Sequence, residues 1–281
     1  MLHTAAYFKR IGYRGPLDPS LTVLRDICSS HLRNVPFEVL DFFDGIAPPL
    51  ELDGIFDKVV TRRCGGSCVE LHGLLAHMLG EVGFDVTMAA GEVALPGGRY
   101  SSRPDHMVLL VQLPDSVRVV DVGFSGVSFV EPLRFNDSWQ HQQGWEYRLK
   151  EFGNQYVVLR RDKSGKSRPL FRFSLQPREL SEFKEAVHHH STSEESPFPR
   201  TLMCARITDS GKLTLINDRL TTADSGREQE STLADAASHE RVLRRIFSGH
   251  DHLAHRALRL WRQRRPGLRT DGVVQQIGTY S

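Results

Sequence analysis

The chain of 281 residues has few cysteines, little net charge and no long apolar run, and each shortage excludes a class of protein. Four cysteines are too few for a disulfide scaffold in a chain of this length, so a reducing cytoplasm is the expected compartment. No stretch reaches the roughly 18 apolar residues of a membrane span, and the first residues lack the apolar core of a signal peptide. We therefore expect a cytoplasmic protein without a membrane partner.

The charges are nearly balanced. There are 36 lysines and arginines against 34 aspartates and glutamates, so the formal net charge is +2. This overall charge does not favour a nucleic-acid partner. The basic run from Arg256 to Arg269 departs from this balance, and we interpret it as the solvated face of a terminal helix. An apolar content of 40% and a charged content of 25% are those of an ordinary globular protein.

Residues 1–84 predict helices. Apolar residues from Leu21 to Leu32 recur at helical spacing, with Asp18 or Ser20 as the N-cap residue. A second amphipathic helix begins near Cys68, after a Gly-Gly pair, and Gly83 is expected to end it.

From about residue 85 to residue 175 the pattern changes to short β-rich runs separated by turn residues. The runs DVTMAAGEVAL, HMVLLVQL, VRVVDVGF, WEYRLKEF, QYVVLRR and LFRFSL predict a small barrel or curled sheet. A helix is then predicted in PRELSEFKEAVHHH and two strands in RTLMCARIT and KLTLIND. The polar segment TTADSGREQESTLADAASHE predicts a loop, and RVLRRIF a last helix.

The segment RRCGGSCVELHGLL, from Arg62 to Leu75, places Cys68 where a glycine turn meets the start of a helix. Unpaired N–H groups and the helix dipole favour the thiolate form of a cysteine there. The same N–H groups can stabilise the oxyanion of an acyl-transfer intermediate. Cys68 is therefore a candidate nucleophile. The alternative is an inert core residue on an apolar helix face, which is our interpretation of Cys28 and Cys204.

A metal site is a further alternative for this segment. Cys64, Cys68 and His72 are spaced four residues apart, and one of the three histidines at 188–190 would complete a tetrahedral set. However, the glycines between the two cysteines separate Cys64 from the helix, and the chain has no CxxC pair. We therefore expect no metal.

A nucleophilic cysteine needs a base, and the base needs a group that orients it. His72 lies one helical turn after Cys68, while His106 opens the strand HMVLLVQL. Asp121 lies between two valines of the next run, a poor place for a carboxylate unless it is paired. If the two strand-like runs pair as a regular hairpin, His106 lies closer to Phe124 than to Asp121. We therefore expect staggered strands or a β-bulge if His106 and Asp121 are in contact.

These motifs together resemble those of the arylamine N-acetyltransferases. The family pattern RGGxCxExN corresponds to CGGSCVELH (64–72), its histidine strand to DHMVLLV and its DxGFG motif to DVGFSG. RIGYRG, VPFEVLD, EPLRF and STSEESPF also match in order, so the resemblance covers nearly the whole chain. It implies an α+β fold with an N-terminal helical bundle (1–84), a central β-barrel (85–190) and a C-terminal α/β lid (191–281).

The resemblance also implies the chemistry. A papain-like triad of Cys68, His106 and Asp121 would transfer an acetyl group from acetyl-CoA to an aromatic amine or hydrazine through a cysteine thioester, in a ping-pong mechanism. Acetyl-CoA would be a substrate, with no permanently bound cofactor and no metal. Phe37 and Phe124 would line the amine pocket. The residues expected near the pantetheine of CoA are Ser101, Ser102, Arg103, Ser125 and Gly126.

Three residues near Cys68 differ from the family pattern. Cys64 replaces the arginine of the pattern RGGxCxExN, and His72 replaces its asparagine. In the segment PFEVL, Val39 replaces the asparagine of the family motif PFENL. The family includes amide synthases that form macrolactams with the same triad. An amide synthase acting on a bulky or carrier-bound acyl thioester, with an acyl carrier protein as partner, is therefore the alternative function. A cysteine peptidase or transglutaminase-like enzyme shares the triad but not the ordered flanking motifs, and an inert Cys68 would mean a protein without enzymatic activity.

Overall fold

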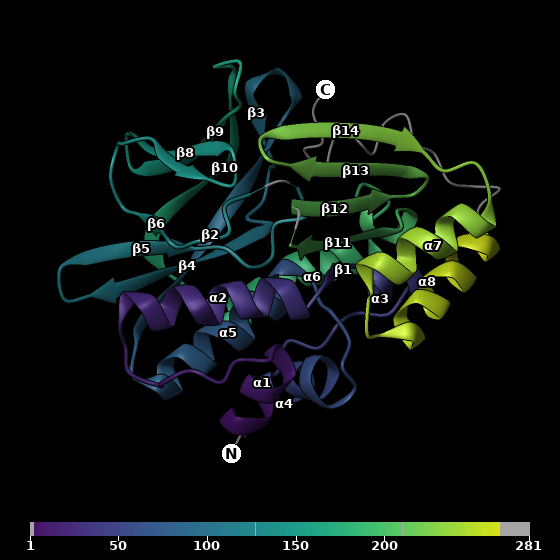
Figure 1. The fold of residues 1–281 in the computed structure, drawn as a ribbon, viewed down its shortest axis with the longest axis horizontal. Helices are drawn as coiled ribbons and strands as arrows, with labels where there is room; N and C mark the ends of the chain where they lie inside the picture. The colour runs from purple at the N-terminus through teal and green to yellow at the C-terminus, as the bar shows by residue number, and fades with distance from the viewer. Residues whose placement is uncertain (1–2, 127, 210, 265–281) are drawn as a thin grey trace.

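The computed structural model describes residues 3–126, 128–209 and 211–264, which form two antiparallel β-sheets with helices packed against them (Figure 1). The helices are α1 (Thr4–Ile11), α2 (Leu21–Asn34), α3 (Leu40–Asp44), α4 (Leu52–Phe56), α5 (Cys68–Val82), α6 (Lys184–Thr192), α7 (Ala236–Ile246) and α8 (Asp251–Arg264). The strands are β1 (Phe37–Glu38), β2 (Asp85–Leu95), β3 (Arg99–Tyr100), β4 (His106–Leu113), β5 (Ser116–Val120), β6 (Leu133–Arg134), β7 (Gln140–Gln142), β8 (Trp145–Phe152), β9 (Gln155–Arg161), β10 (Ser167–Pro177), β11 (Met203–Thr208), β12 (Gly211–Ile216), β13 (Arg219–Asp224) and β14 (Arg227–Thr232).

The two helices predicted from the N-terminal sequence are confirmed as α2 and α5. The Ser20 hydroxyl caps α2 by accepting a hydrogen bond from the Val23 amide at 3.4 Å. At the start of α5, the Glu70 carboxylate accepts hydrogen bonds from the amide and the hydroxyl of Ser67, at 2.8 and 2.9 Å. Gly83 ends α5 in the left-handed conformation, with φ of 102°.

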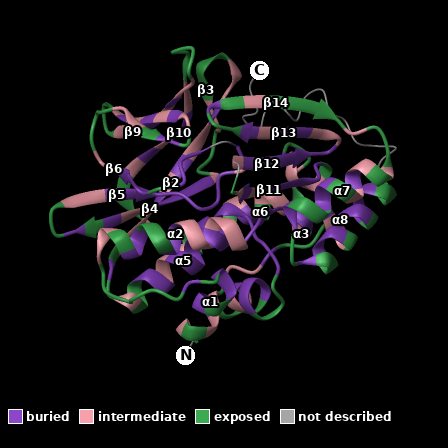
Figure 2. Ribbon diagram, viewed as in Figure 1, coloured by how far each residue is buried: buried purple, intermediate pink, exposed green. Residues whose placement is uncertain are grey.

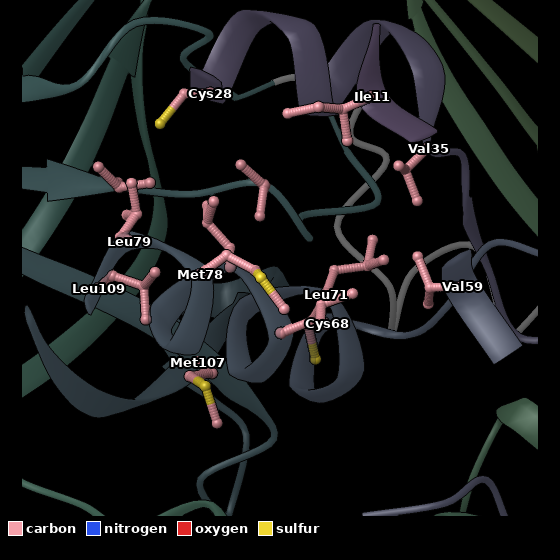
Figure 3. Close-up of a cluster of buried hydrophobic side chains, with 14 of the residues drawn as sticks. Ile11, Cys28, Val35, Val59, Cys68, Leu71, Met78, Leu79, Met107 and Leu109 are labelled. Carbon is pink, nitrogen blue, oxygen red and sulfur yellow. The ribbon is translucent and has the colours of Figure 1, made fainter. Parts of the chain in front are cut away.

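Helix α5 lies at the centre of the largest apolar core. Leu71, Met78 and Leu79 of this helix pack among side chains from α1, α2 and β4, and Figure 3 shows them together with Cys68. Cys28 of α2 is buried in the same core, and burial raises the pKa of its thiol. The interpretation of Cys28 as a core residue is confirmed, and so is that of Cys204, which is buried in a second core.

The six predicted β-rich runs form most of a nine-stranded sheet that curls into a nearly closed barrel (Figure 1). Its strand order is β6-β5-β4-β2-β10-β9-β8-β7, with β3 paired to β2. Strands β4 and β5 pair in regular register, from Leu109 opposite Val120 to Leu113 opposite Ser116. The expected stagger or bulge is therefore wrong. Strand β5 ends at Val120, so the chain leaves the ladder just before Asp121 and can turn the carboxylate back toward β4.

The second sheet has the order β1-β11-β12-β13-β14. Strands β11 and β12 confirm the two predicted runs, but the predicted polar loop after them is wrong, because it forms the hairpin β13–β14. Ser225 and Gly226 both have positive φ, at 48° and 79°, as a tight hairpin turn requires. The strand looks loop-like in sequence because β14 is an exposed edge strand that needs only its neighbour's backbone (Figure 2).

Strand β1 joins the N-terminal part of the chain to the C-terminal sheet. It belongs to the N-terminal segment, yet it pairs with β11 of the C-terminal sheet, and Phe37 also forms a parallel bridge to Gly66. The division of the chain into three domains stays a prediction. None of the helices in the described part of the chain is long and apolar enough to cross a membrane.

The predicted last helix is α7, and the basic run begins on a separate helix, α8. Several arginines of α8 are exposed, as interpreted, but Arg256 instead bonds Asp41 at 2.8 Å and Asp44 at 3.1 Å. The part of the run from residue 265 to Arg269 lies outside the described residues.

Candidate active site

Cys68 is the first residue of α5, directly after a turn that only glycine fits. A side chain on Gly65 would lie 2.3 Å from the carbonyl oxygen of Pro36, because the turn runs against β1. The turn delivers the thiol to the start of the helix, where backbone N–H groups are unpaired. The Cys68 Sγ lies 3.5 Å from the carbonyl oxygen of Asp105, which immediately precedes His106.

His106 is the first residue of β4, and its ring contacts the carboxylate that follows β5. The Nε2 of His106 lies 3.3 Å from Oδ2 of Asp121. Because Nε2 faces the carboxylate, Nδ1 is the ring nitrogen left to exchange a proton with the Cys68 thiol. The structure thus brings Cys68, His106 and Asp121 together in the order that a thiol, a base and an orienting group require.

The electrostatics of this cluster favour a charged imidazole. Burial would lower the pKa of His106, but the charge and hydrogen bond of Asp121, and then Cys68, raise it to about 10. Burial would raise the pKa of Asp121, but the charge and hydrogen bond of His106 hold it well below its ordinary value. An imidazolium beside a thiol stabilises the thiolate, which is the nucleophilic form.

Backbone and side-chain donors hold Asp121 in place. The Gly123 amide donates to Oδ1 at 3.0 Å, and the Ser128 hydroxyl donates to Oδ2 at 3.4 Å. Position 123 needs glycine because a side chain there would lie 2.6 Å from the Cα of Cys68. The loop after β5 therefore packs directly on the first residue of α5.

His72, the second candidate for the base, lies behind Cys68 and is fully buried. Its Nδ1 lies 2.8 Å from the carbonyl oxygen of Cys68, and its Nε2 accepts a hydrogen bond from the Val122 amide at 2.9 Å. Its Nε2 is also 3.3 Å from Oδ1 of Asp121. Both ring nitrogens thus contact backbone groups, and His72 joins α5 to the loop that carries Asp121.

A cavity of about 240 Å³ opens over Cys68 and His106. Its apolar wall includes Phe37, Phe124 and Phe198, and its polar wall includes the segment 101–103 and Ser125. Gly126, the remaining residue expected near CoA, does not line it. The wall formed by residues 195–198, together with His189 and His190, was not assigned from the sequence, although the motif STSEESPF marks it.

A buried lysine beneath the glycine turn was also missed. Lys58 Nζ lies 2.6 Å from Asp41, 2.9 Å from Glu70 and 3.8 Å from Glu38. Burial would lower the pKa of Lys58, but these carboxylates, Glu70 first, raise it above its ordinary value. A cation thus supports the cap of α5 in a region where Cys64 replaces the arginine of the family pattern. In the sequence, the feature that could have indicated the burial of Lys58 is its position directly before two valines.

The hypothetical metal ligands do not form a site. In residues 3–126, 128–209 and 211–264, no three His, Cys, Asp or Glu side chains lie close enough together to hold a metal ion. Cys64 Sγ instead lies 3.9 Å from Nε2 of His252. Burial and the charge of Glu38 raise the pKa of the Cys64 thiol.

Comparison with known proteins agrees with this architecture. A family model described as N-acetyltransferase matches residues 20–250. The arylamine N-acetyltransferase of Mycobacterium tuberculosis is 35% identical over 84% of this chain and 86% of its own, and the proansamycin X synthase of Amycolatopsis mediterranei is 31% identical over 88% and 96%. The solved structure of Mycobacterium marinum arylamine N-acetyltransferase in complex with CoA matches with a TM-score of 0.85 and 30% identity, covering 93% of this chain and 99% of that one.

The fold and these matches together define an acyltransferase. The chain belongs to the arylamine N-acetyltransferase family. The predicted family and the predicted α+β fold class are thereby confirmed.

Proposed function

We propose that the protein transfers an acetyl group from acetyl-CoA to an aromatic amine or hydrazine, with Cys68 as nucleophile, His106 as base and Asp121 as the residue that orients the imidazole. The observation that carries this proposal is the contact between Nε2 of His106 and Asp121, which leaves Nδ1 to the thiol at the cavity wall. The family supports acetyl transfer as the reaction.

The proposed reaction has two steps. The Cys68 thiolate attacks the acetyl carbonyl, the bond to the CoA sulfur breaks, and the CoA sulfur leaves as a thiol after accepting the proton from His106. The amine then attacks the Cys68 thioester, His106 takes a proton from its nitrogen, and the thiolate is released. Unpaired N–H groups in the first turn of α5 are the available donors for the oxyanion in both steps.

The cavity walls support the assignment of the two substrates. Phe37 and Phe124 form an apolar surface suited to an aromatic ring. The segment 101–103, Ser125 and Gly126 are proposed to contact the pantetheine, because the first four of these residues line the same cavity. A free thiol nucleophile works in a reducing compartment, so we also propose a cytoplasmic location.

A second candidate is an amide synthase that joins a bulkier acyl thioester to an amine. The similarity to the proansamycin X synthase over nearly the whole length of both proteins favours it. The comparisons give no support to the acyl carrier protein expected as its partner.

The experiment mixes enzyme with acetyl-CoA in the absence of amine and measures the released CoA thiol. We expect a burst of about one equivalent and one acetyl mass on the Cys68 peptide, because the thioester forms before the amine reacts. Double-reciprocal plots with an arylamine should be parallel. Cys68→Ser serves as the control and should show no burst at the same enzyme concentration.

Longer acyl thioesters, tested beside acetyl-CoA, separate the two candidates. A burst with long acyl chains and none with acetyl-CoA would replace the proposal by the amide synthase. No burst with any thioester, from a folded protein, would defeat acyl transfer through Cys68.

A further inference from the structure

Strand β12 of the C-terminal sheet contacts the active-site cavity from behind through one buried lysine. Lys212 Nζ donates hydrogen bonds to the carbonyl oxygens of Phe124 at 2.6 Å and Gly126 at 2.5 Å. Thr214, two residues further on the same face of the strand, donates to the carbonyl of Ser125 at 3.1 Å. Three successive carbonyls of the segment 123–126, here called the pocket loop, are therefore held by one strand.

The pocket loop connects the catalytic cluster to the cavity wall. It follows Asp121 directly, and Gly123, Phe124 and Ser125 line the cavity. The Phe124 ring packs edge-on against the His106 ring, with centroids 5.4 Å apart. Because the loop belongs to neither sheet, its carbonyls depend on donors from other parts of the fold.

Burying the Lys212 ammonium group costs free energy, so its retention in this position indicates a function. Lys212 is 8% exposed, and burial lowers its pKa to about 8, while Asp121 acts in the opposite direction. Burying an ammonium group is unfavourable unless hydrogen bonds replace its water. A charged donor also forms stronger hydrogen bonds to carbonyl oxygens than a neutral one, so it restrains the loop more firmly.

We propose that Lys212 is a positioning residue that holds the pocket loop so that Phe124 forms the wall of the amine site. It acts on substrate binding and not on the chemistry of the Cys68 thioester, since its bonds go to backbone groups of the wall. Because Ser125 and Gly126 of the same loop are proposed to contact the pantetheine, the burst is measured at saturating acetyl-CoA. This inference rests on the proposed function, which assigns the amine to that wall.

The test measures the Michaelis constant for an arylamine and the turnover number in wild type and in Lys212→Met. This substitution removes the ammonium group but keeps the chain length. Losing a buried charged hydrogen bond should raise this constant about tenfold. The turnover number and the burst of CoA should change less than about threefold, because a wall residue affects binding more than chemistry. Lys212→Arg should restore most of the affinity, and Thr214→Val should show a smaller rise.

The matched control is Thr221→Val. Thr221 is the cross-strand neighbour of Thr214, is similarly buried, and lies on the next strand of the sheet. This control separates loss of loop anchoring from general damage to the sheet, and it should leave the Michaelis constant at the wild-type value.

The wild-type enzyme is measured first, so that an absent burst would count against the proposed function and not against the role of Lys212. An unchanged Michaelis constant in Lys212→Met would overturn the inference. So would an equal fall in burst and turnover at unchanged affinity, which marks a loss of folded enzyme. If Lys212→Met does not fold, Lys212→Gln, whose shorter chain leaves the carbonyls unheld, should show the same rise. If neither variant folds, the role is structural and the inference fails.

Discussion

His106 and His72 contact different carboxylate oxygens of Asp121, each through a ring nitrogen at 3.3 Å. Both are buried, and their rings are 5.6 Å apart in an edge-on arrangement. The difference lies in the other contacts of each ring. His72 bonds the backbone of Cys68 and Val122, whereas His106 contacts Asp121 through Nε2 and lines the same cavity as Cys68.

The comparison teaches that contact with a carboxylate does not by itself identify a catalytic base. A base must also have a nitrogen free to take the proton from the nucleophile or the substrate. In His72 both nitrogens are occupied by the backbone, so it can only position its neighbours. Under the proposed function the two histidines therefore have different roles, a chemical one for His106 and a structural one for His72.

The largest expected effect is that of His106→Ala. It removes the group that exchanges the proton with Cys68, so the rate of thioester formation should fall by ~10⁴-fold or more, as for a triad member. The burst of CoA, followed by mass spectrometry of the Cys68 peptide, measures this rate. A His72 variant that loses more activity than His106→Ala would reverse the comparison.

Asp121→Asn should have the next largest effect, a loss of about 10³-fold in turnover. The amide keeps the shape but can hold the imidazole in the wrong tautomer, so the thiol loses its base. Thermal unfolding followed by circular dichroism checks that the fold survives. If the variant is unfolded, Asp121 acts chiefly through its bonds to Gly123 and Ser128, and the triad assignment weakens.

Thiol labelling compares Cys68 with Cys64, which are 7% and 8% exposed. Since the two residues are similarly exposed, a large difference in rate reports the chemistry of each thiol. Iodoacetamide should modify Cys68 about 10²-fold faster, because burial and then the charge of Glu38 raise the pKa of the Cys64 thiol, whereas Cys68 lies at the start of α5 and lines the cavity with His106. Peptide mapping over time gives both rates, and faster labelling of Cys64 would contradict the assignment of the nucleophile.

The smallest effect is expected for His72→Asn, less than about tenfold in turnover. An amide offers one donor and one acceptor, as a neutral imidazole does, so it can bond the same backbone groups of Cys68 and Val122. Steady-state kinetics on wild type and variant measure this. A loss as large as that of Asp121→Asn would give His72 a direct part in the reaction.

Local sequence patterns predicted most secondary structure, because a cap, a hydrophobic period or a turn residue acts within a few positions of itself. Ser20 and Gly83 are such local signals, and they mark the start of α2 and the end of α5 as observed. The same reasoning missed the hairpin β13–β14, since a polar edge strand is stabilised by its neighbour's backbone and not by its own apolar side chains.

The sequence by itself determined that Cys68 begins a helix behind a glycine turn, that His106 opens a strand-like run and that Asp121 lies within the next run. Which histidine faces the thiol was decided only by the tertiary structure. The end of β5 at Val120 returns Asp121 to His106, and Lys212 joins the pocket loop from nearly 90 residues further along the chain. Such contacts depend on where strands end and how sheets pack, and no local pattern carries that information because the groups meet only in the folded chain.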